Sequence, residues 1–216
     1  MKSVVVALVI SFFIAGCSFS TKPNLWEQKS ATSFESYKKQ RLLGNDALAQ
    51  EDLHRAIEHA KQSADLKPLG RVYVGACALD IAFGKRSTCK RYKEIADVVD
   101  CGYIENYYRF IQKDFSHVNI SQLPQIYQDF ARAMQEGDYT KANEAIKKID
   151  VPSSKLLAIA LLGDRVWVEN IRGALDLFSH YGYKAGVVYL LKKYEAKLDD
   201  PVKKQRIKKK LEILLK

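Results

Sequence analysis

Apolar residues recur at helical spacing along almost the whole chain, and turn residues interrupt them at short intervals. One such stripe consists of Leu53, Ala56, Ile57, Ala60 and Ala64. Its i, i+3, i+4, i+7 pattern places apolar side chains on one face of an α-helix. No segment has the sustained alternation of apolar and polar residues that is typical of a half-buried strand. The sequence therefore predicts an all-α fold of roughly ten short helices.

Glycine, proline and capping residues predict where these helices begin and end. A first helix is expected to end near Gly44, and it carries Trp26, Phe34, Tyr37 and Leu42. Residues 71–83 are apolar nearly all round, which predicts a buried helix closed by Gly84. Further helices are expected over 88–99, 103–115, from the N-cap Ser121 to Met134, over 139–149, and from Ser153 or Ser154 to Leu162. Later breaks are expected at Gly163-Asp164, Gly182 and Asp199-Asp200-Pro201.

The first residues have the order of an export signal. Lys2 supplies a positive charge, and residues 4–16 are uncharged and end on the small residues Ala15 and Gly16. A spanning helix needs about 20 apolar residues, so this run is too short to cross a bilayer. It predicts a signal peptide over residues 1–16. The alternatives are a secretory signal with a chance cysteine at its end, or a buried amino-terminal helix.

The residues Ile14-Ala15-Gly16-Cys17 resemble the lipobox of bacterial lipoproteins. That resemblance implies thioether-linked diacylglycerol on Cys17, cleavage after Gly16 and acylation of the new amino group. One acyl chain anchors only marginally, and several anchor durably. Ser18 differs from the aspartate that retains many Gram-negative lipoproteins in the inner membrane. The implied location is the cell envelope, at the outer membrane facing the periplasm, with residues 17–23 as lipidated cysteine and tether.

The charge of the chain narrows the class of partner. The full sequence has 35 basic and 25 acidic residues, a net charge of +10. Lys2 is the one charged residue of the predicted signal peptide, so the mature chain would keep a net charge of +9. An exported protein meets little nucleic acid, and no nucleic-acid partner is expected. Anionic phospholipid, lipopolysaccharide, peptidoglycan or an acidic protein are the expected counterparts of the positive charge.

Three cysteines follow Cys17, at Cys77, Cys89 and Cys101, each twelve residues from the next. This spacing differs from the paired cysteines of zinc sites, so no metal is expected. Twelve residues of straight helix span about 18 Å, beyond the roughly 7 Å between Cα atoms that a disulfide allows. Buried free thiols are therefore expected. The alternative is a Cys77–Cys89 disulfide, which requires residues 84–87 to fold the chain back.

Residues 136–149 (EGDYTKANEAIKKI) resemble the second half of a tetratricopeptide repeat. Gly137 matches the interhelical turn, Tyr139 the start of the second helix, and Ala142 the small residue at the helix contact. Residues 53–68 and 184–201 resemble the same half. The first-helix signature is missing, and the spacing departs from about 34 residues. The resemblance implies antiparallel helix pairs stacked as a tetratricopeptide-like superhelix over residues 24–216. The alternative is an irregular helical bundle whose alanines allow close packing.

The sequence offers no pattern of catalytic residues. His54 and His59 are five residues apart, which puts them about 140° apart on a helix rather than on one face. His117 and His180 lie near predicted helix ends, where histidines commonly cap or face solvent. The chain has no nucleophile elbow, phosphate-binding glycine loop or dinucleotide fingerprint. No enzymatic activity, cofactor or catalytic residue is expected.

The carboxyl terminus carries the densest positive charge. Against the single Glu212, its basic residues include Lys203, Lys204, Arg206, Lys208, Lys209 and Lys210. Its apolar residues at helical spacing are Val202, Ile207, Leu211, Leu214 and Leu215. The segment is predicted to be an amphipathic helix. It either caps the last repeat with its apolar stripe, or it binds an anionic lipid surface or an acidic partner through its basic face.

Together these features predict a membrane-anchored lipoprotein that acts as a non-enzymatic scaffold or adaptor. It would bind the membrane through lipid on Cys17 and a protein of the envelope through the concave surface that stacked helix pairs create. In anchor and architecture it is similar to lipid-anchored tetratricopeptide families such as secretin pilotins. The alternative is a lipoprotein that binds envelope glycan, peptidoglycan or anionic lipid. Clustered tyrosines, such as Tyr103, Tyr107 and Tyr108, fit either a gripping surface or ordinary packing.

Overall fold

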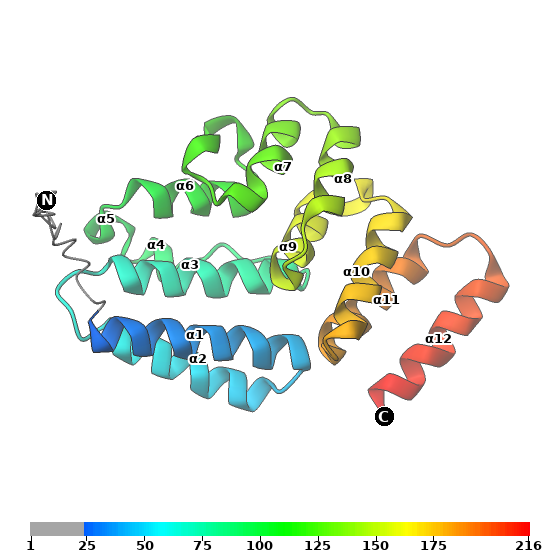
Figure 1. Cartoon of the computed structure of the whole chain (residues 1–216), viewed down its shortest axis with the longest axis horizontal. Helices are drawn as coiled ribbons and strands as arrows, with labels where there is room; N and C mark the ends of the chain where they lie inside the picture. The colour runs from blue at the N-terminus through cyan, green and yellow to red at the C-terminus, as the bar shows by residue number, and fades with distance from the viewer. Residues whose placement is uncertain (1–23) are drawn as a thin grey trace, which may run out of the picture.

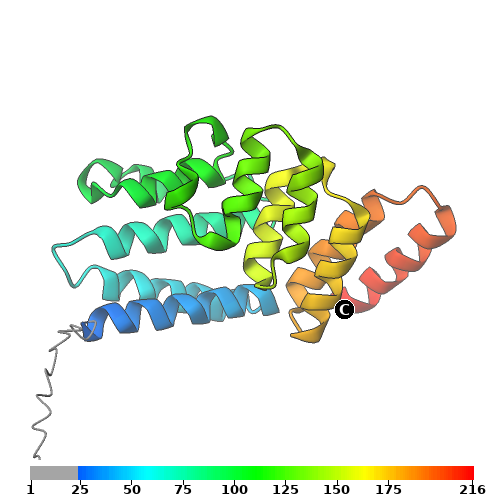
Figure 2. The same ribbon diagram turned by 45° about the horizontal axis from the view of Figure 1, so that its top comes forward.

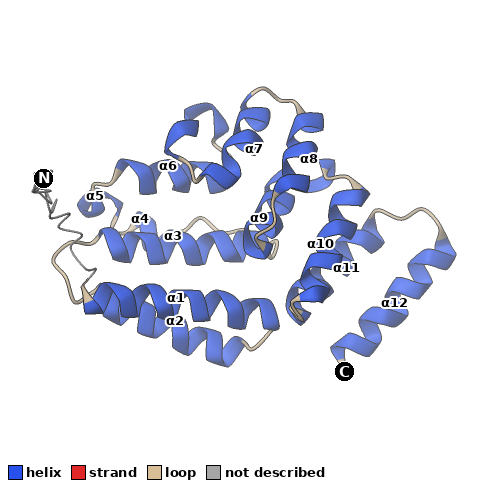
Figure 3. Cartoon of the chain, viewed as in Figure 1, coloured by secondary structure: helices blue, strands red, loops and turns tan. Residues whose placement is uncertain are grey.

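The structure, a computed structural model, describes residues 24–216. Over this range the chain forms twelve α-helices and three short 3-10 helices without any strand (Figure 3). The predicted all-α class is therefore confirmed. The predicted signal peptide, Cys17 and the tether lie outside the described residues. Among the described helices, none is long and apolar enough to cross a membrane.

Three long helices form the amino-terminal part of the molecule (Figure 1). They are α1 (Leu25–Leu43), α2 (Asp46–Ala60) and α3 (Lys67–Ala82). α1 and α2 lie side by side as an antiparallel pair, because Gly44 adopts a φ of 93° and ends α1 where the sequence predicts. The apolar stripe of α2 packs against α3 and against Tyr37 of α1. This packing produces the smaller of the two main hydrophobic clusters.

The next segment differs from its prediction. A single helix over 88–99 is wrong: the chain forms α4 (Lys90–Lys93) and α5 (Ala96–Val99), with a break at Ile95. The break lets Tyr92 pack against Tyr108 while Val99 packs against Gly70 of α3. α6 follows over Gly102–Ile111, four residues shorter than expected at its end, because Lys113 turns the chain with a φ of 65°.

Ser121 is not a helix N-cap, which corrects a second prediction. It lies within the 3-10 helix Ile120–Gln122, and its backbone N–H donates to the Asn119 side chain at 3.1 Å. α7 begins only after Pro124, because a proline ring restricts the residue before it to extended backbone. Leu123 accordingly has a ψ of 153°. The remaining short helices are the 3-10 turns Phe115–His117 and Gly163–Arg165.

Six helices build the carboxyl-terminal part as a succession of packed neighbours (Figure 2). They are α7 (Gln125–Gln135), α8 (Tyr139–Lys148), α9 (Pro152–Leu162), α10 (Val168–His180), α11 (Lys184–Ala196) and α12 (Pro201–Leu215). Gly137 and Gly182 make two of the predicted turns with φ of 68° and 67°. Asp138 caps α8 by accepting from the Lys141 N–H, and Ala142 of that helix is fully buried. The helix-pair packing is confirmed.

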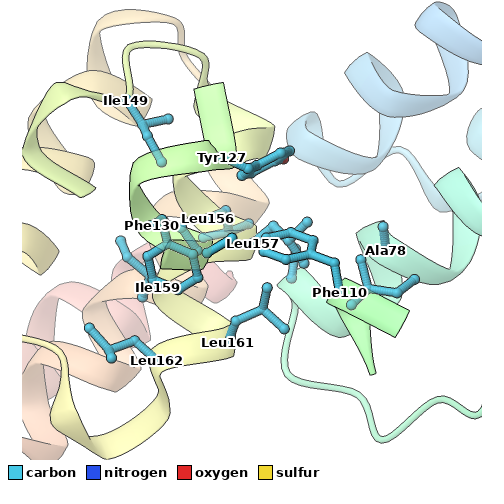
Figure 4. Packing of buried hydrophobic residues seen from close by; sticks show 14 of the residues in the cluster. Ala78, Phe110, Tyr127, Phe130, Ile149, Leu156, Leu157, Ile159, Leu161 and Leu162 are labelled. Atoms are coloured by element: carbon cyan, nitrogen blue, oxygen red, sulfur yellow. The ribbon is translucent and has the colours of Figure 1, made fainter. Parts of the chain in front are cut away.

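α9 forms the centre of the larger hydrophobic cluster. Leu156, Leu157 and Ile159 are at most 2% exposed, since helices surround α9 on several sides. Figure 4 shows these side chains meeting Phe110 of α6, Tyr127 and Phe130 of α7 and Ala78 of α3. The core is therefore continuous from the amino-terminal helices into the stacked pairs, and it fixes the two parts relative to each other.

Cys77 and Cys89 form a disulfide, so the expectation of free thiols at these positions is wrong. α3 ends at Ala82, and Gly84, with a φ of 77°, reverses the chain. The two Cα atoms consequently lie 5.3 Å apart, although twelve residues separate them in the sequence. Cys101 is free and half-buried. The alternative that the sequence left open, a bridge across the turn at 84–87, is the one that the fold adopts.

Candidate functional site: a groove along α3

Three adjoining cavities form a continuous groove, which we call the α3 groove: the first two lie along α3, and the third continues beside α1. Their volumes are about 430, 300 and 500 Å³. The first and second cavities share Gly75, Tyr107 and Pro124. The second and third share Lys38 and Ser153. The groove thus runs between α1 and α3 on one side and α6, α7 and α9 on the other.

Arg71 marks one end of the groove. Its Nε donates a hydrogen bond of 2.6 Å to the Tyr103 hydroxyl, and its guanidinium lies over the Tyr103 ring, 5.5 Å from the centroid. A terminal nitrogen of Arg71 lies 3.6 Å from a carboxylate oxygen of Glu27. Behind this charged rim the cavity is apolar, with a lining that includes Val74, Ile104, Leu123 and Pro124.

Small residues of α3 form the floor of the central cavity. Gly75, Ala78 and Ala82 recur at helical spacing along it. Gly75 also allows α1 to approach closely, because a Cβ there would lie 2.5 Å from the Phe34 ring. The absence of a larger side chain at Gly75 therefore sets both the depth of the groove and the position of Phe34.

Two tyrosines contribute hydroxyl groups to the groove, the buried Tyr127 and the half-buried Tyr107. Burial raises the pKa of Tyr107 well above its usual value, and the neighbouring Tyr127, whose ring centroid lies 6.1 Å away, adds to the rise. Burial likewise raises the pKa of Tyr127. Because burial favours the neutral form of both phenols, they add no charge to the groove.

The third cavity continues the groove to the end of α1. Glu35, Lys39 and Leu42 of α1 face Val151 and Tyr183 across it. Lys38 is paired with Glu35 at 2.6 Å. This end consequently carries more charged side chains than the central cavity, where Lys38 alone is charged.

The length of the groove suits an extended polypeptide. From Arg71 to Ala82, α3 rises about 16 Å, which matches roughly five residues of extended chain. Apolar and aromatic walls with a few polar groups are typical of binding sites. In the part of the chain that the structure describes, no cluster of His, Cys, Asp and Glu could hold a metal ion.

The predicted anionic-surface residues lie away from this groove, on α12 at the other end of the molecule (Figure 1). Lys203, Arg206, Lys208, Lys209 and Lys210 are exposed, and Lys204 is half-buried. Lys203 lies 3.7 Å from Asp200, and Lys208 lies 3.9 Å from Glu195. Ile207 and Leu211 are buried against Leu191 of α11. The segment is therefore an amphipathic helix, as predicted.

Sequence reasoning singled out only part of the groove. It noted the tyrosines near residue 103, and the structure divides them: Tyr103 and Tyr107 line the groove, whereas Tyr108 packs against Tyr92. It did not identify Phe34, Lys38 or Arg71 as site residues. The available signal was Gly75, a glycine inside a long apolar helix, because such a residue marks a close approach or a functional need.

The chain was also compared with protein-family models, with curated proteins and with solved structures, and none of the three comparisons finds a match.

Proposed function

We propose that this chain is a membrane-anchored lipoprotein whose α3 groove holds an extended segment of an envelope protein, without catalysing a reaction on it. The observation that carries the proposal is the continuity of the three cavities, two of them along α3, with a floor of small residues and an apolar central cavity. Five helices that belong to one core supply its walls. A preformed groove lowers the conformational cost of binding an extended segment.

The anchor rests on the lipobox-like residues before Cys17 and on the disulfide. Disulfides persist in oxidising compartments such as the periplasm and are rare in the cytosol, so the Cys77–Cys89 bond supports export. We expect Cys17→Ala to leave a precursor that is neither cleaved nor lipidated. Intact-mass measurement of the chain recovered from cells checks this. Normal processing and membrane retention of the variant would contradict the proposed anchor.

Site-specific photocrosslinking in cells tests the groove. A photoreactive amino acid at Lys38, which lines both the central and the third cavity, should capture one discrete protein. The matched control is the same amino acid at Lys90 of α4, whose side chain is 85% exposed and lies outside the groove. Equal adducts from both positions, or none from Lys38, would contradict the proposal.

A second candidate function is binding to an anionic lipid surface through α12. By helical periodicity Val202 and Lys209 point away from the buried Ile207, whereas Ile213 lines the hollow between α12 and its neighbours that Ile207 also lines. Val202 and Ile213 are 62% and 64% exposed. Basic residues beside exposed apolar ones are typical of helices that lie on anionic membranes.

Vesicle co-sedimentation of the unlipidated Cys17→Ala chain tests this second function. We expect binding to phosphatidylglycerol vesicles at low salt, since each basic residue near the surface contributes about 1 kcal/mol. Replacing Arg206, Lys209 and Lys210 by Gln should strongly reduce the fraction of the chain that sediments with the vesicles. The same charge change at Lys85, Lys90 and Lys93 is the control. If both variants sediment alike, α12 serves as a capping helix and not as a lipid-binding one.

A further inference from the structure

We infer that the Arg71 end of the α3 groove recognises the carboxyl-terminal residue of a partner protein, with its apolar side chain in the cavity and its carboxylate on Arg71. The inference rests on the proposed function and specifies which part of the partner is bound. It follows from the chemistry of the cavity, the unused donors of Arg71 and the continuation of the groove.

The cavity combines one positive charge with apolar walls. Of the described residues that line it, Arg71 alone is charged. Val74, Ile104 and Leu123 behind it are each at most 4% exposed. A ligand complementary to this surface carries an apolar group and, at one edge, a single negative charge. The cavity has a volume of about 430 Å³, which lies in the range of small-ligand sites and is large enough for one apolar side chain.

The guanidinium of Arg71 is positioned to pair with such a negative charge. Its Nε is already used by Tyr103, which together with the ring beneath fixes the plane of the fork. One of its terminal nitrogens lies 3.6 Å from a carboxylate oxygen of Glu27, which is longer than a normal hydrogen bond. A planar guanidinium forms paired hydrogen bonds with a carboxylate. An incoming carboxylate can therefore replace the loose contact with Glu27.

The rest of the groove indicates a protein end rather than a small acid. The cavity opens at Gly75 and Tyr107 into the central part, which can hold the residues that precede the terminal one. The Phe34 ring covers Gly75, and the small side chains of Ala78 and Ala82 beyond it line the part of the central cavity where a backbone would lie. The roughly five extended residues that fit along α3 would then end at Arg71.

Binding of a pentapeptide pool to the immobilised full chain tests the inference. The pool has four randomised positions followed by Leu or Phe, and it is prepared as free acids and as carboxyl-terminal amides. We expect the acids to be retained at least about tenfold better, because the amide removes the charge that Arg71 pairs. Arg71→Gln should abolish this preference, and Glu27→Gln, which removes the competing carboxylate, should strengthen it.

The control variant is Arg132→Gln on α7. Arg132 matches Arg71 in side-chain exposure, 53% against 52%, and it is also paired with an acidic residue, Asp129. The Arg132→Gln variant should keep the preference for free acids over amides. Equal retention of acids and amides, or an unchanged preference in Arg71→Gln, would overturn the inference. If the peptide test fails but crosslinked adducts from Lys38 still form in cells, the groove binds a protein segment other than a carboxyl terminus. If the adducts from Lys38 are also absent, the proposed function is wrong as well.

A small-acid competitor distinguishes the protein end from a free carboxylic acid. Octanoate combines an apolar chain with one carboxylate but has no peptide backbone to occupy the central cavity. We expect it to displace the acid pool only at much higher concentration than the best pentapeptides do. Displacement at equal concentration would overturn the assignment to a protein terminus.

Discussion

Replacing Cys77 and Cys89 by alanine is expected to lower the free energy of unfolding by about 3 kcal/mol. The bond closes a loop of twelve residues, and without it the unfolded chain gains the corresponding conformational freedom. For a chain of this size the melting temperature should fall by about 3 °C per kcal/mol. Thermal unfolding followed by circular dichroism measures the change.

The free thiol provides the control for this experiment. Cys101→Ala removes a half-buried thiol that closes no loop, and its effect should stay below about 1 kcal/mol. A reducing agent should lower the melting temperature of the natural chain and leave the Cys77→Ala/Cys89→Ala chain unchanged. If the reducing agent has no effect on the natural chain, the two cysteines are free thiols and the fold of the 83–89 turn is wrong.

Replacing Gly186 by alanine is expected to destabilise the protein by about 1–3 kcal/mol, the usual cost of forcing volume into a packed core. Alanine is a better helix former than glycine, so this exchange normally stabilises a helix. At Gly186 we expect the opposite effect. The reason is Phe178: a Cβ at Gly186 would overlap its ring edge and lie 3.2 Å from its Cγ. Phe178 is fully buried in the larger hydrophobic cluster, so any shift of its ring would disturb packed neighbours.

Gly173 is the matched control, because it lies inside α10 and a Cβ there would meet nothing within 4 Å. Gly173→Ala should raise the free energy of unfolding by about 0.5–1 kcal/mol. Urea unfolding of both variants measures the two opposite changes. Stabilisation by Gly186→Ala would mean that α10 and α11 do not pack as closely as described.

Local signals predicted the helices well, because the residues that end them act through their own backbone. Gly44, Gly84, Gly137 and Gly182 were all expected at turns, and each adopts a positive φ. Asp138 and Asp200 stand at the starts of helices, where their side chains accept from backbone N–H groups of the first turn. Such features depend on few neighbours, so the sequence alone reveals them.

Features that depend on distant residues could not be predicted in this way. The helical spacing of 88–99 gives no sign of the break at Ile95, which serves contacts with α6 and α3. Asn143 is an example within a predicted helix. Fully buried, it donates to the Arg165 carbonyl at 3.0 Å and accepts from the Trp167 N–H at 2.8 Å, and so holds α8 against the start of α10. Periodicity treats this residue as merely polar.

The groove could not be predicted from the sequence, because it too depends on residues that are distant along the chain. Its walls come from five helices, and Phe34 and Arg71 line neighbouring cavities of it only because α1 and α3 run alongside each other. Stacked helix pairs predicted a concave binding surface in general terms. They did not predict its place. The tetratricopeptide resemblance itself stays a prediction, although Ala142 is buried as that resemblance implies.

The most direct test of the account is whether filling the α3 groove removes the protein captured from Lys38. Ser153 is half-buried and lines the central and third cavities, so Ser153→Trp should obstruct both. Thr140→Trp adds the same side chain to the exposed surface of α8 and serves as the control. The account predicts that the adduct from Lys38 is lost in Ser153→Trp and kept in Thr140→Trp, with equal melting temperatures. An unchanged adduct in a folded Ser153→Trp chain would contradict it.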